Sequence, residues 1–426
     1  MRTQGVNGLA SGSAGLGLVL WLTFINSMGT GVVTNGIYFL TKSAYGLGIK
    51  GSFALGVVMG LTYIAGAKAV GPLLNWLKRS PRHSTRGAFI LITIGCGLLC
   101  LVPLAAEFFG ISGQWPAWVL VAAYSPLTGC MWPITEAYLS GGRRGESLRR
   151  ALGAFNVTWS TALVAAFWAM GPLVKEHPLH VVAGLGVLHL LTIALVAALP
   201  PEPAAHSHED AEPHPPIYAR LLSAHRLLLP LGYLIVSTMS PFLPTAYAAM
   251  GLAVGWHTPL TATWHAARVA GFFWFQYDQR WHGRWWAPVA ASIAVVIGFG
   301  LVMLATKAGP MTESSLPIVM IASGLVLLGF GVAAIYTGAL YYAMAVGGAE
   351  VDAGGTHEAL IGAGYTIGPG IGLAAAVATE RAWLDAGAFE WIVVVAMVTV
   401  SGLTWLVIAR KRRTNRRGTD AGTRAE

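Results

Sequence analysis

Long apolar runs, separated by short polar segments, fill most of the chain. A membrane-spanning helix needs roughly 20 mostly apolar residues, so each run is a candidate span. Six runs precede a polar gap near the middle of the chain and six follow it. The predicted spans are residues 16–40, 53–74, 88–104, 118–139, 152–174, 179–199, 227–250, 259–277, 287–305, 316–346, 359–378 and 389–409. We therefore predict an all-α membrane protein with twelve transmembrane helices in two six-helix bundles.

The same order of elements occurs once in each half of the chain. A span is followed by two adjacent glycines, a short polar loop and another span, over residues 137–166 and again over 343–376. Similar halves in a hydrophobic chain are typical of transporters built from two related bundles. The repeat therefore predicts that the two bundles are pseudo-symmetric.

These boundaries divide the chain into five parts. We expect a cytoplasmic N-terminus, an N-terminal bundle, a cytoplasmic linker, a C-terminal bundle and a basic cytoplasmic tail, over residues 1–15, 16–199, 200–226, 227–409 and 410–426. The linker is rich in Pro, His and acidic residues and cannot bury a core, so we expect it to be flexible. Its run 206–210, His-Ser-His-Glu-Asp, could bind zinc or nickel. A solvated linker is the simpler interpretation, and no metal site is predicted.

The composition argues against a soluble protein. Only 11% of the 426 residues are charged, whereas a soluble domain has roughly 25%. The mean hydropathy is +0.61. The three cysteines, Cys96, Cys100 and Cys130, lie inside apolar runs, which argues against a disulfide framework.

The basic residues that give the net charge of +9 lie mainly at the ends of the spans and in the tail. The charge therefore does not predict nucleic-acid binding. One set of loops and the tail hold most of the basic residues: Lys78, Arg79, Arg82, Arg86, Arg143, Arg144, Arg149, Arg150, Arg280, Arg284, Arg410, Lys411, Arg412, Arg413, Arg416 and Arg417. Positive loops stay in the cytoplasm, so both termini are predicted to be cytoplasmic, which fits an even number of spans. We expect an integral protein of a bacterial cytoplasmic (inner) membrane.

A loop motif after the eighth span adds a family resemblance. Residues 278–284, Asp-Gln-Arg-Trp-His-Gly-Arg, resemble in stretched form the G-x-x-x-D-R-x-G-R-R motif of the major facilitator superfamily. The corresponding segment after the second span, 71–79, has Asn75 where the acid is expected. With six spans on each side of a linker, the chain is similar to this superfamily along its length up to the basic tail.

The resemblance implies a central cavity that a rocking motion of the halves exposes to each side in turn. It implies that spans one, four, seven and ten line the cavity, with contributions from five, eight and eleven. It also assigns Asp278, Arg280 and Arg284 to a cytoplasmic latch that breaks as the halves move. Because Asn75 carries no charge, the latch of the first half should be weaker.

Arg268 and His265 are predicted to lie near the middle of the membrane. Arg268 precedes Asp278 by ten residues, which is about 15 Å along a helix, and His265 shares its helix face. Embedded charges are costly and usually functional. We interpret both residues as contacts for an anionic or polar solute, or as parts of a proton relay. The alternative is an arginine held by backbone carbonyls or by a buried acid.

Glu136 and Lys68 have similar predicted depths. They lie about 7 Å and about 10 Å from the cytoplasmic ends of the fourth and second spans. This similarity favours an ion pair with a structural or gating role. The alternative is that Glu136 is a carboxylate that couples transport to protons.

Further polar and aromatic side chains are candidates for the cavity lining. They are Asn26, Thr30 and Asn35 in the first span, Asn156 and Trp159 in the fifth, Tyr336 in the tenth and Tyr365 in the eleventh. Any one of them could instead hydrogen-bond a neighbouring helix, which is worth only about 0.6 kcal/mol on average. Near the eleventh span, Thr356 is interpreted as an N-cap and Glu358 as a favourable first-turn acid.

The sequence therefore predicts a secondary transporter for a small polar or amphipathic solute, working by alternating access. Proton coupling is a hypothesis that rests on Glu136 and His265. No nucleophile elbow, zinc-protease motif or phosphate-binding loop is found, so we predict no enzyme activity, no cofactor and no ATP-driven transport. The alternative is a non-transporting sensor or scaffold that kept the fold.

The expected partners are the solute, protons and the lipid bilayer, with the chain acting as a monomer. Arg268 and His265 favour an anionic or polar solute. The aromatic residues of the predicted lining are also compatible with sugars, nucleosides and drugs.

Overall fold

The computed structural model describes residues 13–77, 79, 83–143, 145–204, 214–347 and 351–422, and the regular structure of these residues is entirely helical. The helices are α1 (Leu16–Gly29), α2 (Ile37–Tyr45), α3 (Ile49–Leu77), α4 (Thr85–Phe108), α5 (Trp115–Ser140), α6 (Gly145–Met170), α7 (Pro178–Ala197), α8 (Pro216–Ala249), α9 (His257–Tyr277), α10 (Trp286–Leu304), α11 (Leu316–Gly347), α12 (Val351–Glu380) and α13 (Phe389–Gly422). A π-helical segment, Thr30–Asn35, joins α1 to α2, and short 3-10 turns cover Val254–Trp256, Ala305–Ala308 and Ala386–Ala388.

Apolar composition makes most of these helices suitable for a bilayer. Within the described ranges, eleven helices are long and apolar enough to cross a membrane, which confirms the predicted all-α membrane protein. The remaining predicted span, 259–277, forms the 21-residue helix α9. Its polar side chains, including His265, Arg268 and Gln276, make α9 less apolar than the others.

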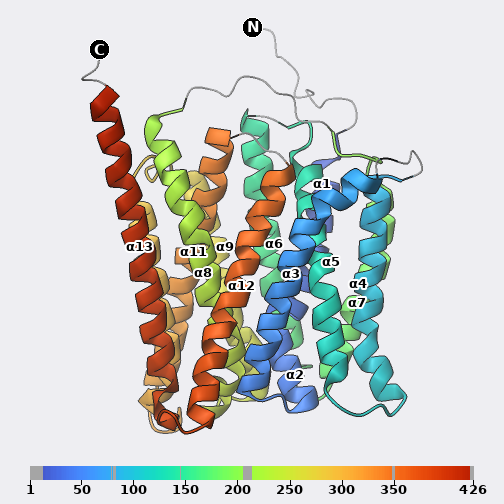
Figure 1. Cartoon of the computed structure of the whole chain (residues 1–426). Coiled ribbons are helices and arrows are strands. Elements are labelled where there is room, and N and C mark those ends of the chain that lie inside the picture. Colours follow the sequence, from blue (N-terminus) through green and yellow to red (C-terminus); the bar gives the residue numbers. More distant parts are fainter. Residues whose placement is uncertain are drawn as a thin grey trace.

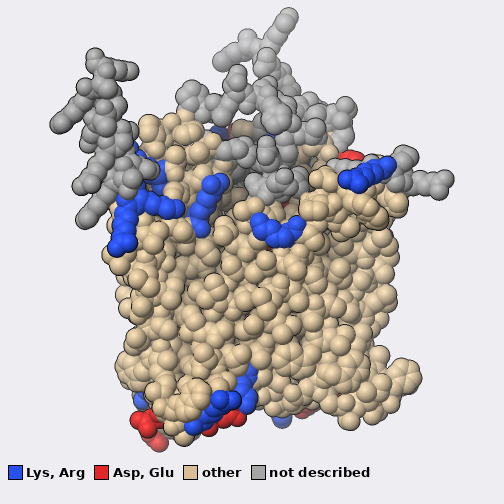
Figure 2. All heavy atoms as spheres, viewed as in Figure 1, with Lys and Arg blue, Asp and Glu red and all other residues tan. Residues whose placement is uncertain are grey.

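The surface of the molecule matches a bilayer. The helices stand side by side with roughly parallel axes, and α1 begins at the end of the bundle where α13 finishes (the upper end in Figure 1). On the face shown in Figure 2, charged side chains gather towards the two ends, and the band between them is uncharged. Large apolar side chains such as Leu91, Leu191, Ile297 and Leu403 are exposed on the outer helices. A hydrocarbon environment suits so wide an apolar surface.

The first predicted span, 16–40, is interrupted by the π-helical segment. Within it, the backbone N–H of Gly36 donates to the carbonyl oxygen of Gly31 at 2.8 Å, and Asn35 Nδ2 donates to the carbonyl oxygen of Thr30 at 3.1 Å. Short π segments inside α-helices occur frequently at functional sites. Here the segment places Thr30 and Thr34 against the central cavity described below.

Two helices extend beyond the predicted spans. α8 begins at Pro216, inside the expected linker, and α13 continues to Gly422, inside the expected tail. Composition alone misses the start of α8, because proline is compatible with the first turn of a helix and Leu221 and Leu222 are buried there. The His-rich run 206–210 lies outside the described residues.

Glycines bring α3 and α12 into close contact, and these helices join the first half of the chain (13–204) to the second half (214–422). A Cβ added at Gly355 would lie 3.0 Å from the carbonyl oxygen of Ala67. Towards the other end of the same pair, a Cβ at Gly372 would lie 2.1 Å from the ring of Phe53. Small residues let membrane helices approach this closely.

A second helix pair, α6 and α9, also joins the halves. A Cβ added at Gly153 would lie 2.6 Å from the side chain of Gln276, and one at Gly171 would lie 2.8 Å from the ring of Pro259. These contacts lie near opposite ends of both helices. The two halves therefore touch along both of these helix pairs.

We predict that Gly66→Ala destabilises the fold. A Cβ at Gly66 would lie 2.0 Å from the carbonyl oxygen of Pro126 in α5, and backbone cannot move aside as a flexible side chain can. Overpacking of this kind costs about 1–3 kcal/mol, so the midpoint of thermal unfolding in detergent should fall. Gly300→Ala is the matched control, because nothing lies within 4 Å of the added Cβ. Equal midpoints for the two variants would contradict the close contact of α3 with α5.

Candidate functional site

A cavity of about 50 Å³ lies between the two halves of the chain. This volume has room for a few water molecules. The first half contributes Thr30, Thr34, Tyr63, Trp132, Glu136, Phe155 and Trp159 to its lining, and the second half contributes Tyr233, Tyr336, Glu358, Ile361 and Tyr365. The lining is therefore mainly aromatic, with two acidic side chains, one from each half.

The structure places the residues of the predicted lining in two groups. Thr30, Trp159, Tyr336 and Tyr365 line the cavity, as does Glu136. The three asparagines are not among the lining residues.

Each of the three asparagines has a different environment. Asn26 is buried, and its side-chain nitrogen and oxygen have no hydrogen-bond partner among the described residues. Asn35 bonds within the π-helical segment. Asn156 Oδ1 accepts a hydrogen bond from Trp159 Nε1 at 3.3 Å, so it orients a ring of the lining.

Glu136 and Glu358 are the acidic groups of the cavity. They come from α5 and α12 and lie near enough for their charges to interact. The hydroxyl of Tyr63 donates a hydrogen bond to Glu358 Oε2. Among the described residues, neither carboxylate has a basic partner within ion-pair distance. Two embedded carboxylates without a counter-charge are costly, which is typical of functional rather than structural groups.

Arg268 lies behind the aromatic wall and is not a lining residue. It is 1% exposed, and its Cζ lies 4.1 Å from the ring centroid of Trp159 and 4.6 Å from that of Trp264. Its Nη2 is 2.9 Å from His265 Nδ1. A guanidinium can only donate, so Nδ1 must accept and the proton of a neutral ring is on Nε2. The charge is therefore held by tryptophan faces and an imidazole, instead of the backbone carbonyls or buried acid considered from the sequence.

The predicted ion pair between Glu136 and Lys68 is wrong. Lys68 is exposed, whereas Glu136 lines the cavity, and the two form no ion pair in the described part of the chain. The buried face of α3 carries Tyr63, Ala67 and Val70. Similar depth does not bring two residues together when one of them points outwards, and helix periodicity turns Lys68 about 100° from Ala67.

The capping interpretation of Thr356 and Glu358 is also wrong. Helix α12 begins at Val351, so both residues lie beyond its first turn, and Glu358 is buried against the cavity. The sequence did contain a signal. Glu358, Ile361 and Tyr365 recur at helical spacing and share one face, which is the face that lines the cavity. The sequence does not mark the lining residues Tyr63, Trp132, Phe155 and Tyr233, because aromatic side chains in apolar helices usually pack in the core.

Asp278 and Arg280 of the predicted latch form a local pair. Arg280 Nε lies 2.9 Å from Asp278 Oδ1 and Nη2 lies 3.0 Å from Oδ2. These hydrogen bonds lower the pKa of Asp278 below its ordinary value. The Arg280 side chain is 84% exposed and Arg284 is exposed as well. The motif therefore shapes its own loop, and an exposed pair of this kind adds little stability.

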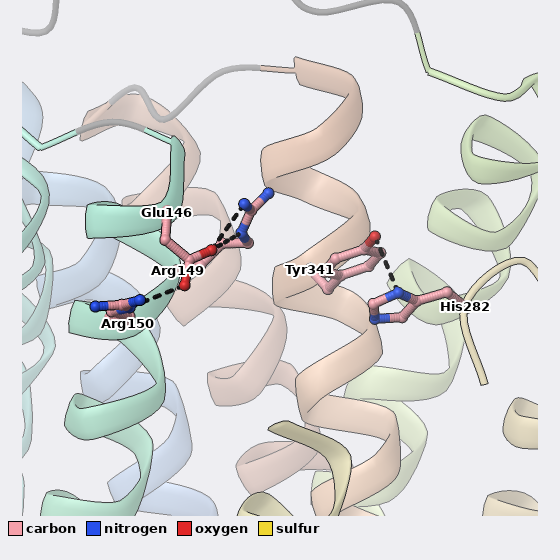
Figure 3. A network of polar contacts seen from close by, with 5 residues as sticks. All are labelled: Glu146, Arg149, Arg150, His282 and Tyr341. Atoms are coloured by element: carbon pink, nitrogen blue, oxygen red, sulfur yellow. Dashed lines mark hydrogen bonds and ion pairs between the residues drawn. The ribbon is translucent and has the colours of Figure 1, made fainter. Parts of the chain in front are cut away.

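A polar cluster lies where α6 meets the second half, near the end of the molecule where α13 finishes (Figure 3). Glu146 pairs with Arg149 at 2.8 Å and with Arg150 at 2.9 Å. Beside them, the Tyr341 hydroxyl lies 3.4 Å from His282 Nδ1, and the two rings stack. Burial, and to a smaller extent the charge of Arg149, lowers the pKa of His282.

The halves also touch at the opposite end of the molecule. Lys42 Nζ donates to the carbonyl oxygen of Pro244 at 3.0 Å, and Lys50 pairs with Glu380 at 2.6 Å. Each of these contacts joins a residue of the first half to a residue of the second. Polar contacts therefore link the halves at this end of the molecule.

Comparison with known proteins gives the fold. No protein-family model matches the sequence, and no curated protein matches it. The structure is similar to the nucleoside transporter NupG, with a TM-score of 0.66 and 10% identity over 92% of this chain and 98% of that one. It is similar to an auto-inhibited peptide transporter of the POT family (TM-score 0.64, 12% identity, 94% and 96% covered). It is also similar to a bacterial homologue of the human lysosomal transporter Spinster in an inward-facing, unoccupied conformation (0.61, 12%, 93% and 95%). The chain has the major facilitator fold, which confirms the predicted resemblance at the level of fold.

We predict that Arg268→Lys lowers thermal stability although it keeps the charge. An ammonium group cannot lie flat between two indole rings, and a buried cation–π contact is worth about 2 kcal/mol. The measurement is the unfolding midpoint in detergent. Arg381→Lys is the matched control, because Arg381 lies over Trp383 on the exposed surface. Equal effects of the two substitutions would contradict a structural role for the buried stack.

We predict that His282 contributes to acid sensitivity. Because its pKa is lowered in the fold, its contribution to stability is present above the ordinary histidine pKa of about 6.5 and is lost as the pH falls through the lowered value. His282→Gln should therefore lose less thermal stability than the wild type between about pH 7.5 and about pH 5. His83→Gln, at an exposed position, should leave the pH profile unchanged. A profile for His282→Gln identical to the wild type would contradict the prediction.

Proposed function

We propose that the protein is a secondary transporter that moves a small solute through the central cavity by alternating access and couples this movement to protons. In this proposal α9 crosses the membrane with the eleven more apolar helices. The chain then forms two six-helix bundles, over residues 16–199 and 227–409. The fold supports this reading, because the three similar structures are transporters.

The pair Glu136 and Glu358 is the observation that carries the proposal. Each half supplies one carboxylate to a shared cavity, and the described residues provide no basic partner for either. Two negative charges close together in a low-dielectric site repel strongly, and a bound proton or a bound cation removes that cost. A site that binds a proton and a cation in turn suits coupled transport.

Alternating access requires the halves to separate at one end at a time. At the end where Lys50 meets Glu380, the ion pair is exposed, and such pairs contribute only about 0–1 kcal/mol. At the other end, the ion pairs of Glu146 lie within α6 and the Tyr341–His282 contact lies within the second half, so neither has to break when the halves separate. Either end can therefore open at modest cost. Breaks in the helices, such as the π-helical segment and Pro369 in α12, suit the bending that this motion needs.

The charge distribution supports an orientation. The end of the bundle where α13 finishes carries Arg149 and Arg150 in the first turns of α6, together with the basic end of α13. We assign this end to the cytoplasm of a bacterial inner membrane, in agreement with the positive-inside rule.

The test is solute uptake by proteoliposomes with an imposed pH gradient. A panel of amines, carboxylates, sugars, nucleosides and short peptides should contain at least one solute whose uptake is saturable and falls when a protonophore is added. Glu136→Gln and Glu358→Gln should each reduce gradient-driven uptake at least about tenfold, because the proton-carrying group is lost. Lys68→Ala is the matched control and should transport normally, since Lys68 is exposed.

Two results would contradict this proposal in different ways. Saturable uptake that is unaffected by the protonophore and by both glutamine variants would remove proton coupling and leave transport. Absence of saturable uptake for the whole panel, with folded protein in the liposomes, would instead favour a sensor or scaffold.

A further inference from the structure

We propose that the cavity, once the halves separate enough to admit a solute, is selective for an organic cation, such as a protonated or quaternary amine, and discriminates against anions. This inference deepens the proposed function and rests on it, because the cation is the transported solute only if the protein is a transporter. Binding of the cation can be tested without transport. It reverses the preference for an anionic or polar solute that Arg268 and His265 suggest in the sequence.

The aromatic side chains form a box suited to a positive charge. Seven of the twelve lining residues are aromatic. Tyr365 stands edge-on to both Tyr63 and Tyr233, with ring centroids 5.9 Å and 5.6 Å apart, and Trp159 lies 5.6 Å from Tyr336. These rings come from both halves and line the same cavity. Such cages bind ammonium groups through the negative faces of the rings.

The carboxylates give the box its charge preference. Glu136 and Glu358 lie in the same lining, and the described residues offer neither of them a basic partner. A cationic solute would supply the missing counter-charge, whereas an anion would add a third negative group to a low-dielectric site. Uncharged solutes gain the aromatic contacts but leave the repulsion of the two carboxylates in place.

Arg268 keeps its positive charge, but the two carboxylates of the lining outnumber it and no lining residue is basic. Its guanidinium lies against Trp159 and Trp264 and bonds His265, and the side chain is almost fully buried behind the lining. Arg268 is not among the lining residues, whereas Trp159, over which it lies, is one of them. The Trp159 contact shows in addition that a ring of this wall binds a cation within the protein itself.

The experiment compares solutes that share a carbon skeleton and differ in charge. One set is choline, 3,3-dimethylbutanol and 3,3-dimethylbutanoate; the other is 2-phenylethylammonium, 2-phenylethanol and 3-phenylpropionate. Binding to the purified full chain is measured as the rise in unfolding midpoint with solute concentration, because a ligand of the folded state stabilises it. Uptake of the same solutes is measured in proteoliposomes.

We expect the cation of at least one set to stabilise the protein, and its neutral and anionic partners not to do so. Glu358→Gln and Glu136→Gln should each weaken cation binding at least about tenfold. Glu358→Asp keeps the charge and should keep the cation preference. It is the control for a glutamine variant that loses binding only because it fails to fold. Glu313→Gln, at an exposed carboxylate outside the cavity, should bind as the wild type does.

The possible outcomes separate the two proposals. Stabilisation by a carboxylate or an alcohol equal to that of the matched cation overturns the cation inference, as does failure of both cations to bind. Cation binding without uptake keeps the inference and contradicts the transport function. Uptake of an anion with normal proton coupling keeps the transport function and overturns the inference.

Discussion

The structure depends on how closely the backbones of neighbouring helices can approach. In a bilayer the hydrophobic effect does not drive helices together, so association relies on close packing at small residues. At Gly66, Gly329 and Gly368, an added Cβ would lie 2.0 to 2.2 Å from a carbonyl oxygen of the adjoining helix. These contacts set α5 against α3, α11 against α9 and α12 against α8. The helices that carry the cavity residues are therefore held at fixed distances, and the cavity is what their larger side chains leave open.

The charges of the site are separated in an unusual way. Two carboxylates lie in the cavity, while the nearby guanidinium is held on indole faces behind the wall. Had Arg268 paired with Glu136 or Glu358, the site would hold a structural ion pair with little capacity for exchange. Because aromatic rings stabilise the arginine instead, the carboxylates remain available for a proton or a cationic solute.

The sequence predicts the fold well because its main signal is one-dimensional. Runs of about 20 apolar residues mark the spans, and the rise per residue gives the depth of residues such as Arg268. What it predicts poorly is which way a side chain points. Lys68 and Glu136 have similar predicted depths but face different ways. Glu358 lies beyond the first turn of α12 because that helix begins earlier than the sequence predicts. Such errors arise wherever a helix end or a π-helical turn changes the rotation of the residues that follow.

The limited hydropathy of α9 has a consequence for how the protein is made. A helix with Arg268 near its centre partitions poorly into lipid by itself, because a central arginine costs about 2.5–3.5 kcal/mol during insertion. In the folded protein this cost is offset by Trp159 of α6 and by Trp264. In the proposed twelve-helix arrangement, α6 is synthesised before α9, so its indole ring would be available when Arg268 enters the membrane. Insertion of α9 would then depend on helices that were inserted earlier, and the order of synthesis would contribute to assembly.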